Sequence, residues 1–128
     1  MMAKAEAADL SAMADDAKAI DRLHVIDVDH LSAFTDGDSD LEAELFDLYQ
    51  NTAERYLKGM ETALGQDQAW SAEAHALKGA SANLGACRVA ALAKAAEFEA
   101  PSPARLEVLR IAVDDVTAFF AEQRAPGR

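Results

Sequence analysis

Disulfides and long apolar runs are both missing from this sequence. Its only cysteine, Cys87, has no second cysteine in the chain to pair with, which is typical of proteins in a reducing compartment. The stretch MMAKAEAADL at the N-terminus lacks the apolar core of a signal peptide, and no apolar run is long enough to cross a bilayer. We therefore expect a cytoplasmic protein with no membrane partner.

Proline, glycine and strand-forming residues are also scarce. The 128 residues include three prolines and six glycines, while 51% are hydrophobic, a composition that argues against general disorder. Much of the hydrophobic content is alanine, the strongest helix former, and residues that favour strands are sparse. The sequence predicts an all-α protein, and its length fits one domain with its own core.

Positive charge is in short supply. Twelve Lys and Arg residues are set against 23 Asp and Glu residues, which gives a formal net charge of −11. Nucleic acids and anionic membranes would be repelled by this excess. Neither is expected as a partner.

Four segments carry an apolar residue at every third or fourth position, the spacing of a helix with one buried face. The first is expected to open at Asp40, after the capping-box pair Ser39 and Glu42, and to stop near Gly65. The residues expected on its buried face are Leu41, Leu45, Leu48, Thr52, Tyr56 and Met60.

Three further helical segments follow after short connections. The first is expected over residues 67–84 and stops at Gly85, and the second is expected over residues 88–99. The third begins after Ser102, because Ser102 and Pro103 suit a helix cap and first turn. Their expected core residues are Trp70, Ala74, Leu77, Ser81 and Leu84, then Val89, Leu92 and Ala96, then Leu106, Leu109, Val113, Val116 and Phe120. Four amphipathic helices with short connections predict an antiparallel four-helix bundle.

Two segments precede these helices. Residues 25–34 predict a short helix, and TDGDSD at residues 35–40 predicts a turn. Residues 1–20 form an N-terminal extension whose apolar content is thin, so a frayed or docked extra helix and a disordered segment are equally expected. The bundle domain is expected to cover residues 21–124, with no second domain.

A single histidine stands in the alanine-rich stretch AHALKGASANLGA. With His75 at zero on a helical wheel of about 100° per residue, the expected core residues lie on the opposite side, while Lys78, Gly79 and Ala82 lie within about 60° of it. The imidazole would face solvent, with a cation beside it and little bulk to block a large partner. A neutral imidazole is a competent nucleophile. The pattern therefore favours capture of a phosphoryl group, with Lys78 placed to offset negative charge.

The same stretch resembles the signature of histidine-containing phosphotransfer (HPt) domains, which is approximately A-H-x-L-K-G-x-S-x-x-L-G-A. The match includes His75, Lys78, Gly79 and Ser81. The preceding DLEAELFDLYQNTAERYLKGMETAL is similar to the helix before the histidine in that family. The resemblance extends over residues 25–123.

This resemblance implies a phosphorelay intermediate. His75 would accept a phosphoryl group from the aspartyl phosphate of one receiver domain and pass it to another, while Lys78 steadies the phosphoryl oxygens and Gly79 admits the receiver. The receiver would bring Mg²⁺, and this chain would bind no cofactor or metal of its own. The implied partners are response-regulator receiver domains and a hybrid histidine kinase. The chain would be a monomeric phosphocarrier rather than a stand-alone kinase.

Many members of the family hold the other nitrogen of the histidine with a Gln or Glu on the following helix. The candidates here are Lys94 and Glu97, of which only Glu97 could accept such a hydrogen bond, and either could equally be a solvated surface charge. Arg55, Lys58 and Arg88 could add positive potential around the histidine or could serve only solubility.

The main alternative is a helical adaptor that binds a receiver or a histidine kinase without carrying phosphate. A related variant is the substrate domain of a histidine kinase, separated from its catalytic part. The sequence shows no Gly-rich phosphate loop or kinase-like nucleotide segment, which favours a free-standing carrier. His24 and His30 have no His or Cys at metal-ligand spacing and are expected at the surface.

Overall fold

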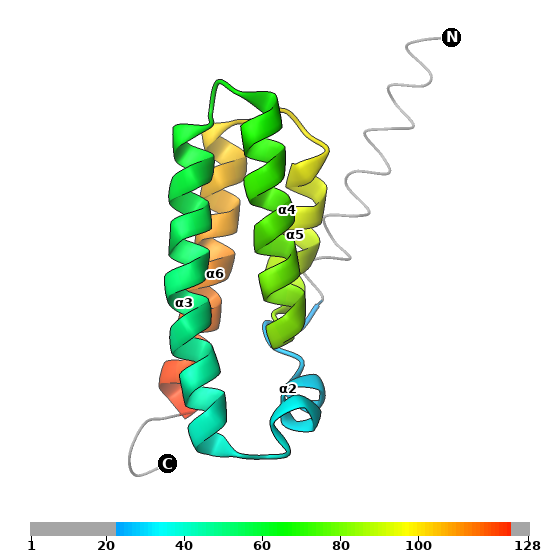
Figure 1. Ribbon diagram of the computed structural model, residues 1–128, viewed down its shortest axis with the longest axis vertical. Helices are drawn as coiled ribbons and strands as arrows, with labels where there is room; N and C mark the ends of the chain where they lie inside the picture. Colours follow the sequence, from blue (N-terminus) through cyan, green and yellow to red (C-terminus); the bar gives the residue numbers. More distant parts are fainter. Residues whose placement is uncertain (1–22, 124–128) are drawn as a thin grey trace, which may run out of the picture.

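The computed structural model describes residues 23–123, so the expected extension at residues 1–20 lies outside the described residues. Four helices lie side by side and alternate in direction (Figure 1): α3 (Ser39–Thr62), α4 (Asp67–Leu84), α5 (Cys87–Glu97) and α6 (Pro103–Gln123). Their contacts close a ring from α3 to α4, α5, α6 and back to α3, and the short α2 (Val28–Thr35) lies against α3 at one end. This arrangement confirms the predicted all-α fold class. Within the described range, no helix is both long and apolar enough to cross a membrane.

Three of the four helices bury the faces that their sequences predict. Every expected core residue of α4 and α6 is buried, and in α5 Val89 and Ala96 are buried while Leu92 packs at the edge. Trp70 is fully covered, and its indole Nε1 donates a hydrogen bond of 2.9 Å to the carbonyl of Ala96. This bond satisfies a buried donor and ties α4 to α5.

The face of α3 that is buried differs from the face that the sequence predicts, so the predicted core face of α3 is wrong. The buried residues of α3 are Phe46, Tyr49, Ala53, Leu57 and Met60. Of the expected set only Met60 is among them, while Leu45 and Tyr56 pack at the edge of the core and Leu48 is 64% exposed. Two apolar stripes run side by side on α3, and partners on other helices decide which one is buried. Phe46, for example, stacks on Phe120 with ring centroids 4.3 Å apart.

A buried polar pair joins α3 to α4. Tyr49 Oη and Ser81 Oγ lie 2.8 Å apart, so each buried hydroxyl has a hydrogen-bond partner. Burial raises the pKa of Tyr49 to about 12, although the bond to Ser81 acts in the opposite direction. The phenol therefore stays neutral at ordinary pH, and Ser81 is a buried residue of the motif that joins α4 to α3 through this hydrogen bond.

The start of α3 does not use the predicted capping box. Asp38 caps the helix instead, because its carboxylate accepts hydrogen bonds of 3.0 and 3.1 Å from two backbone N–H groups of the first turn. Ser39 is the first helical residue, one position earlier than expected. Glu42 accepts a 2.7 Å hydrogen bond from the hydroxyl of Thr35 and so connects α3 to the end of α2.

Two other helix starts are set by side-chain caps. α2 begins three residues later than expected, because Asp27 caps it by accepting a 3.1 Å hydrogen bond from the backbone N–H of His30. α6 begins as predicted at Pro103, after Ser102, whose hydroxyl accepts from the backbone N–H of Arg105 at 3.1 Å.

Gly85 ends α4 and holds the chain that leads into α2. Its φ of 88° lies in the left-handed region that favours glycine. Its carbonyl accepts a 2.7 Å hydrogen bond from the N–H of Asp27. A Cβ at Gly85 would lie 3.1 Å from the Asp27 carbonyl oxygen and 3.2 Å from Cδ2 of His30. Backbone conformation and close approach therefore both require glycine here.

Gly85→Ala is expected to lower the free energy of unfolding by about 1–2 kcal/mol, because alanine is disfavoured in the left-handed region and its Cβ crowds Asp27. The matched control is Gly65→Ala in the α3–α4 connection, where a Cβ meets nothing within 4 Å. Chemical denaturation of both variants measures the difference. Equal stability of the two would show that the close approach at Gly85 is not required.

Candidate functional site

His75 lies in the middle of α4, on the side of the helix opposite the buried stripe. Its side chain is 63% exposed. One turn further along α4, Gly79 is also exposed, and a Cβ there would meet no atom within 4 Å. Ala72 and Ala82 are exposed near it on the same side and add little bulk. A large partner can therefore reach the imidazole.

The carboxylate of Glu97, at the end of α5, contacts one nitrogen of this imidazole. His75 Nδ1 lies 2.9 Å from Glu97 Oε1. Because a carboxylate can only accept, Nδ1 is the donor, and in the neutral ring Nε2 keeps its lone pair. The Glu97 side chain is only 13% exposed, so most of it is covered by its surroundings. Of the two candidates on α5, Glu97 contacts the ring, whereas Lys94 is exposed.

Lys78 lies close to the same carboxylate. Its Nζ is 3.6 Å from Glu97 Oε2, a buried oxygen that accepts no hydrogen bond within residues 23–123. The Glu97 carboxylate therefore lies between an imidazole and an ammonium group. We call His75, Lys78 and Glu97 the histidine cluster. The flexible four-carbon stem of Lys78 allows its charge to move toward an incoming anion.

The other basic residues considered from the sequence lie elsewhere. Arg55 and Lys58 line a shallow hollow that α3 shares with α6. Arg88 is at the start of α5, nine residues before Glu97 and so about 13 Å away along the helix, where it forms an ion pair of 3.6 Å with Asp115 of α6. None of these three residues takes part in the contacts described for His75 and Glu97 within residues 23–123.

An apolar groove lies beside the histidine cluster. It is a hollow of about 270 Å³ between α3 and α4, closed at one end by α2. We call it the α3–α4 groove, and its lining residues are Phe34, Leu45, Leu48, Tyr49, Thr52, Ala80, Asn83 and Leu84. Phe34 and Leu48 are 63% and 64% exposed. Ala80 in its α4 wall is five residues from His75, about 7 Å along the helix.

The groove was not predicted from the sequence, although the apolar residues that line it are visible there. Leu45, Leu48 and Thr52 belong to the α3 stripe that was expected in the core. Part of this stripe lines the surface groove, and a second apolar stripe beside it fills the core.

Comparison with known families identifies the class of protein. The family model of the Hpt domain matches residues 44–119, which include all of α4 and α5 and most of α3 and α6. The match covers more than half of the chain, and the chain belongs to the Hpt domain family, as the resemblance of AHALKGASANLGA predicts. This family serves histidine phosphotransfer in phosphorelays. No curated protein and no solved structure matches the chain.

The contact with Glu97 predicts the tautomer of the neutral His75 ring. The proton is expected on Nδ1, and Glu97→Ala should shift it toward Nε2, because the acceptor at Nδ1 is lost. Nitrogen NMR of the imidazole rings reports the tautomer directly. Lys94→Ala is the control on α5 and should leave the tautomer unchanged. A wild-type ring protonated at Nε2, or no response to Glu97→Ala, would contradict the assignment.

Proposed function

We propose that this protein is a phosphocarrier whose His75 accepts a phosphoryl group from a receiver-domain aspartate and relays it to another response-regulator receiver. The observation that carries the proposal is the exposed imidazole whose Nδ1 is bound by Glu97, because this leaves Nε2 as the nucleophile. Membership of the Hpt domain family supports the phosphotransfer chemistry in general. A hybrid histidine kinase would supply the first receiver.

In the accepting step, the Nε2 lone pair of His75 forms a bond to phosphorus while the bond from phosphorus to the aspartyl oxygen breaks. The aspartate leaves as a carboxylate with that electron pair. Nδ1 keeps its proton, so the phosphorylated ring gains positive charge opposite the Glu97 carboxylate. In the donating step a carboxylate oxygen of the next receiver attacks phosphorus, and Nε2 recovers its lone pair.

Lys78 has a charge-balancing role in this proposal. It follows His75 by three residues, on the same side of α4, and its side chain is about one-third exposed. Moving its ammonium group from Glu97 toward the phosphoryl oxygens would stabilise the charge that they carry. Mg²⁺ would come with the receiver, and this chain would bind neither a metal nor a nucleotide for the transfer. We propose that the carrier acts as a monomer in the cytoplasm.

The α3–α4 groove supports a protein domain as the partner. Its exposed Phe34 and Leu48 offer apolar area that a protein surface can bury. The net charge of −11 disfavours nucleic acid in the same place. A receiver seated on this groove would extend over Gly79 toward His75, where the absence of a side chain leaves room for it.

His75→Ala is expected to abolish phosphoryl transfer. The wild-type chain is incubated with a panel of receiver domains from its source organism, each carrying radiolabelled aspartyl phosphate, and the label is then sought on the carrier. The label should be labile in acid and stable in base, as for a phosphorus–nitrogen bond. His24→Ala is the matched control, since His24 is also exposed, and it should keep the label.

Label that is equal on the wild type and on His75→Ala would contradict the carrier proposal. A receiver that binds tightly but never transfers label to the wild type would favour the adaptor instead.

Gly79→Gln is expected to keep the fold, to stabilise α4 by roughly 0.5–1 kcal/mol through its higher helix propensity, and to slow transfer by about tenfold or more. The reason is that the new side chain would occupy the open space beside His75. Gly79→Ala should have a smaller effect, and Gly65→Gln, in the α3–α4 connection, is the control. Single-turnover transfer and thermal unfolding are measured on all three. An unchanged transfer rate in Gly79→Gln would refute the role of access.

A further inference from the structure

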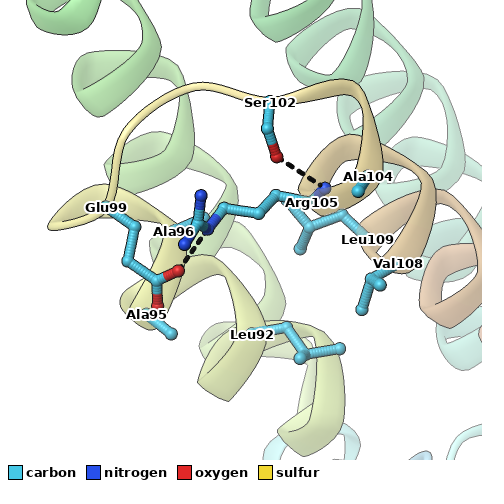
Figure 2. Close-up of a pocket in the computed structure, with 9 residues that line it drawn as sticks. All are labelled: Leu92, Ala95, Ala96, Glu99, Ser102, Ala104, Arg105, Val108 and Leu109. Carbon is cyan, nitrogen blue, oxygen red and sulfur yellow. Dashed lines mark hydrogen bonds and ion pairs between the residues drawn. The ribbon is translucent and has the colours of Figure 1, made fainter. Parts of the chain in front are cut away.

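A second apolar groove lies between α5 and α6 (Figure 2). It is a hollow of about 430 Å³, and we call it the α5–α6 groove. Its apolar lining comes from Leu92, Ala95, Ala96, Ala104, Val108 and Leu109. At its rim Arg105 forms an ion pair with Glu99 and donates a 3.0 Å hydrogen bond to the carbonyl of Ala100. Because these rim groups already have partners, the groove offers an occupant mainly apolar contact.

The α6 wall of this groove continues along the helix as exposed apolar surface. Val108 is 48% exposed, and Ile111, one turn further on, is 53% exposed. A helix that faced only solvent would carry polar residues at these positions. Covering both side chains would remove apolar area from water and stabilise the fold.

The chain enters the described structure at the end of this same groove. Arg88 Nη2 donates a 2.9 Å hydrogen bond to the carbonyl of Leu23, and Arg88 Nη1 lies 3.6 Å from Asp115. Arg88 is one turn before Leu92 on α5, and Asp115 is one turn after Ile111 on α6. Whatever precedes Leu23 therefore starts at the seam between the two helices.

The sequence before Leu23 has apolar residues at helical spacing, which would give a helix one apolar face to place in the groove. In residues 7–20 the apolar positions Ala7, Leu10, Met13, Ala17 and Ile20 recur every three or four residues. The segment's three large apolar residues all belong to this stripe, and its charged residues fall outside it on a helical wheel. As a helix, these 14 residues would extend about 21 Å, whereas α6 rises about 16 Å from Ala104 to Asp115.

We propose that residues 7–20 occupy the α5–α6 groove as an amphipathic helix, with Ile20 beside Ile111 and with Met13 and Leu10 further along the groove toward Ala104. Three observations carry the proposal: the unpartnered apolar groove, the attachment of Leu23 at its end, and the matching apolar stripe. The small alanines of the stripe permit the close approach that helix packing needs. The occupied groove would brace α5, the helix that ends in Glu97.

Hydrogen exchange of the full chain, followed by mass spectrometry, tests this proposal. Amides of residues 7–20 are expected to exchange at least tenfold more slowly than in a free peptide of the same sequence, because the docked helix protects them. Val108→Glu and Ile111→Glu should remove this protection while α3 and α4 stay protected. Leu48→Glu is the matched control, since it places the same charge at an exposed apolar position of the α3–α4 groove.

Thiol labelling provides a second measurement from the groove side. In a Cys87→Ala background, Ile111→Cys should react slowly with a thiol reagent, and the added substitutions Leu10→Glu and Met13→Glu should accelerate this reaction about tenfold or more. Absence of protection in the wild type, or protection that survives Val108→Glu and Ile111→Glu together, would overturn the proposal. Protection that disappears on dilution together with a dimer in light scattering would also overturn it, by making a second copy the occupant.

Discussion

The hydrogen bond from the Trp70 indole to the Ala96 carbonyl fixes how α4 lies against α5, and the site depends on that register. Trp70 is fully buried, so this bond cannot be exchanged for one to water without exposing the ring. Ala96 is the neighbour of Glu97 in the chain. A shift of α4 by one turn, about 5.4 Å, would separate the His75 ring from the Glu97 carboxylate. The exposed cluster is therefore positioned by a contact inside the core.

Much of the fold could be predicted from the sequence where a helix has one apolar stripe. The stripe of α4 is of this kind, and every residue predicted for it is buried. The stripe predicted for α6 is buried as well, although Val108 and Ile111 form further apolar surface outside it. α3 has two neighbouring stripes, and periodicity alone cannot say which one meets the core. Phe46 is buried because it stacks on Phe120, and Tyr49 is buried where it hydrogen-bonds to Ser81. Both partners lie far away in the sequence. Tertiary partners of this kind are not visible in local spacing.

The candidate site also combines features that the sequence of one helix predicts with features that depend on how two helices pack. The exposure of His75 and the open space at Gly79 follow from the wheel of a single helix. The choice of Glu97 over Lys94 required the register of two helices, which only the structure provides. The two glycines of the motif also differ in their physical surroundings. Gly79 has free space around it, whereas Gly85 has a left-handed backbone and a neighbouring carbonyl that leave no room for a side chain.

The shared carboxylate of Glu97 has an electrical consequence for the proposed carrier. With a neutral imidazole, the charges of Lys78 and Glu97 cancel, so the cluster starts without net charge. A phosphoryl group on Nε2 adds about two negative charges, but the ring that keeps its Nδ1 proton gains one positive charge. The loaded cluster would then hold only about one excess negative charge. The proton on Nδ1 would thus offset about half of the charge that loading brings to the cluster.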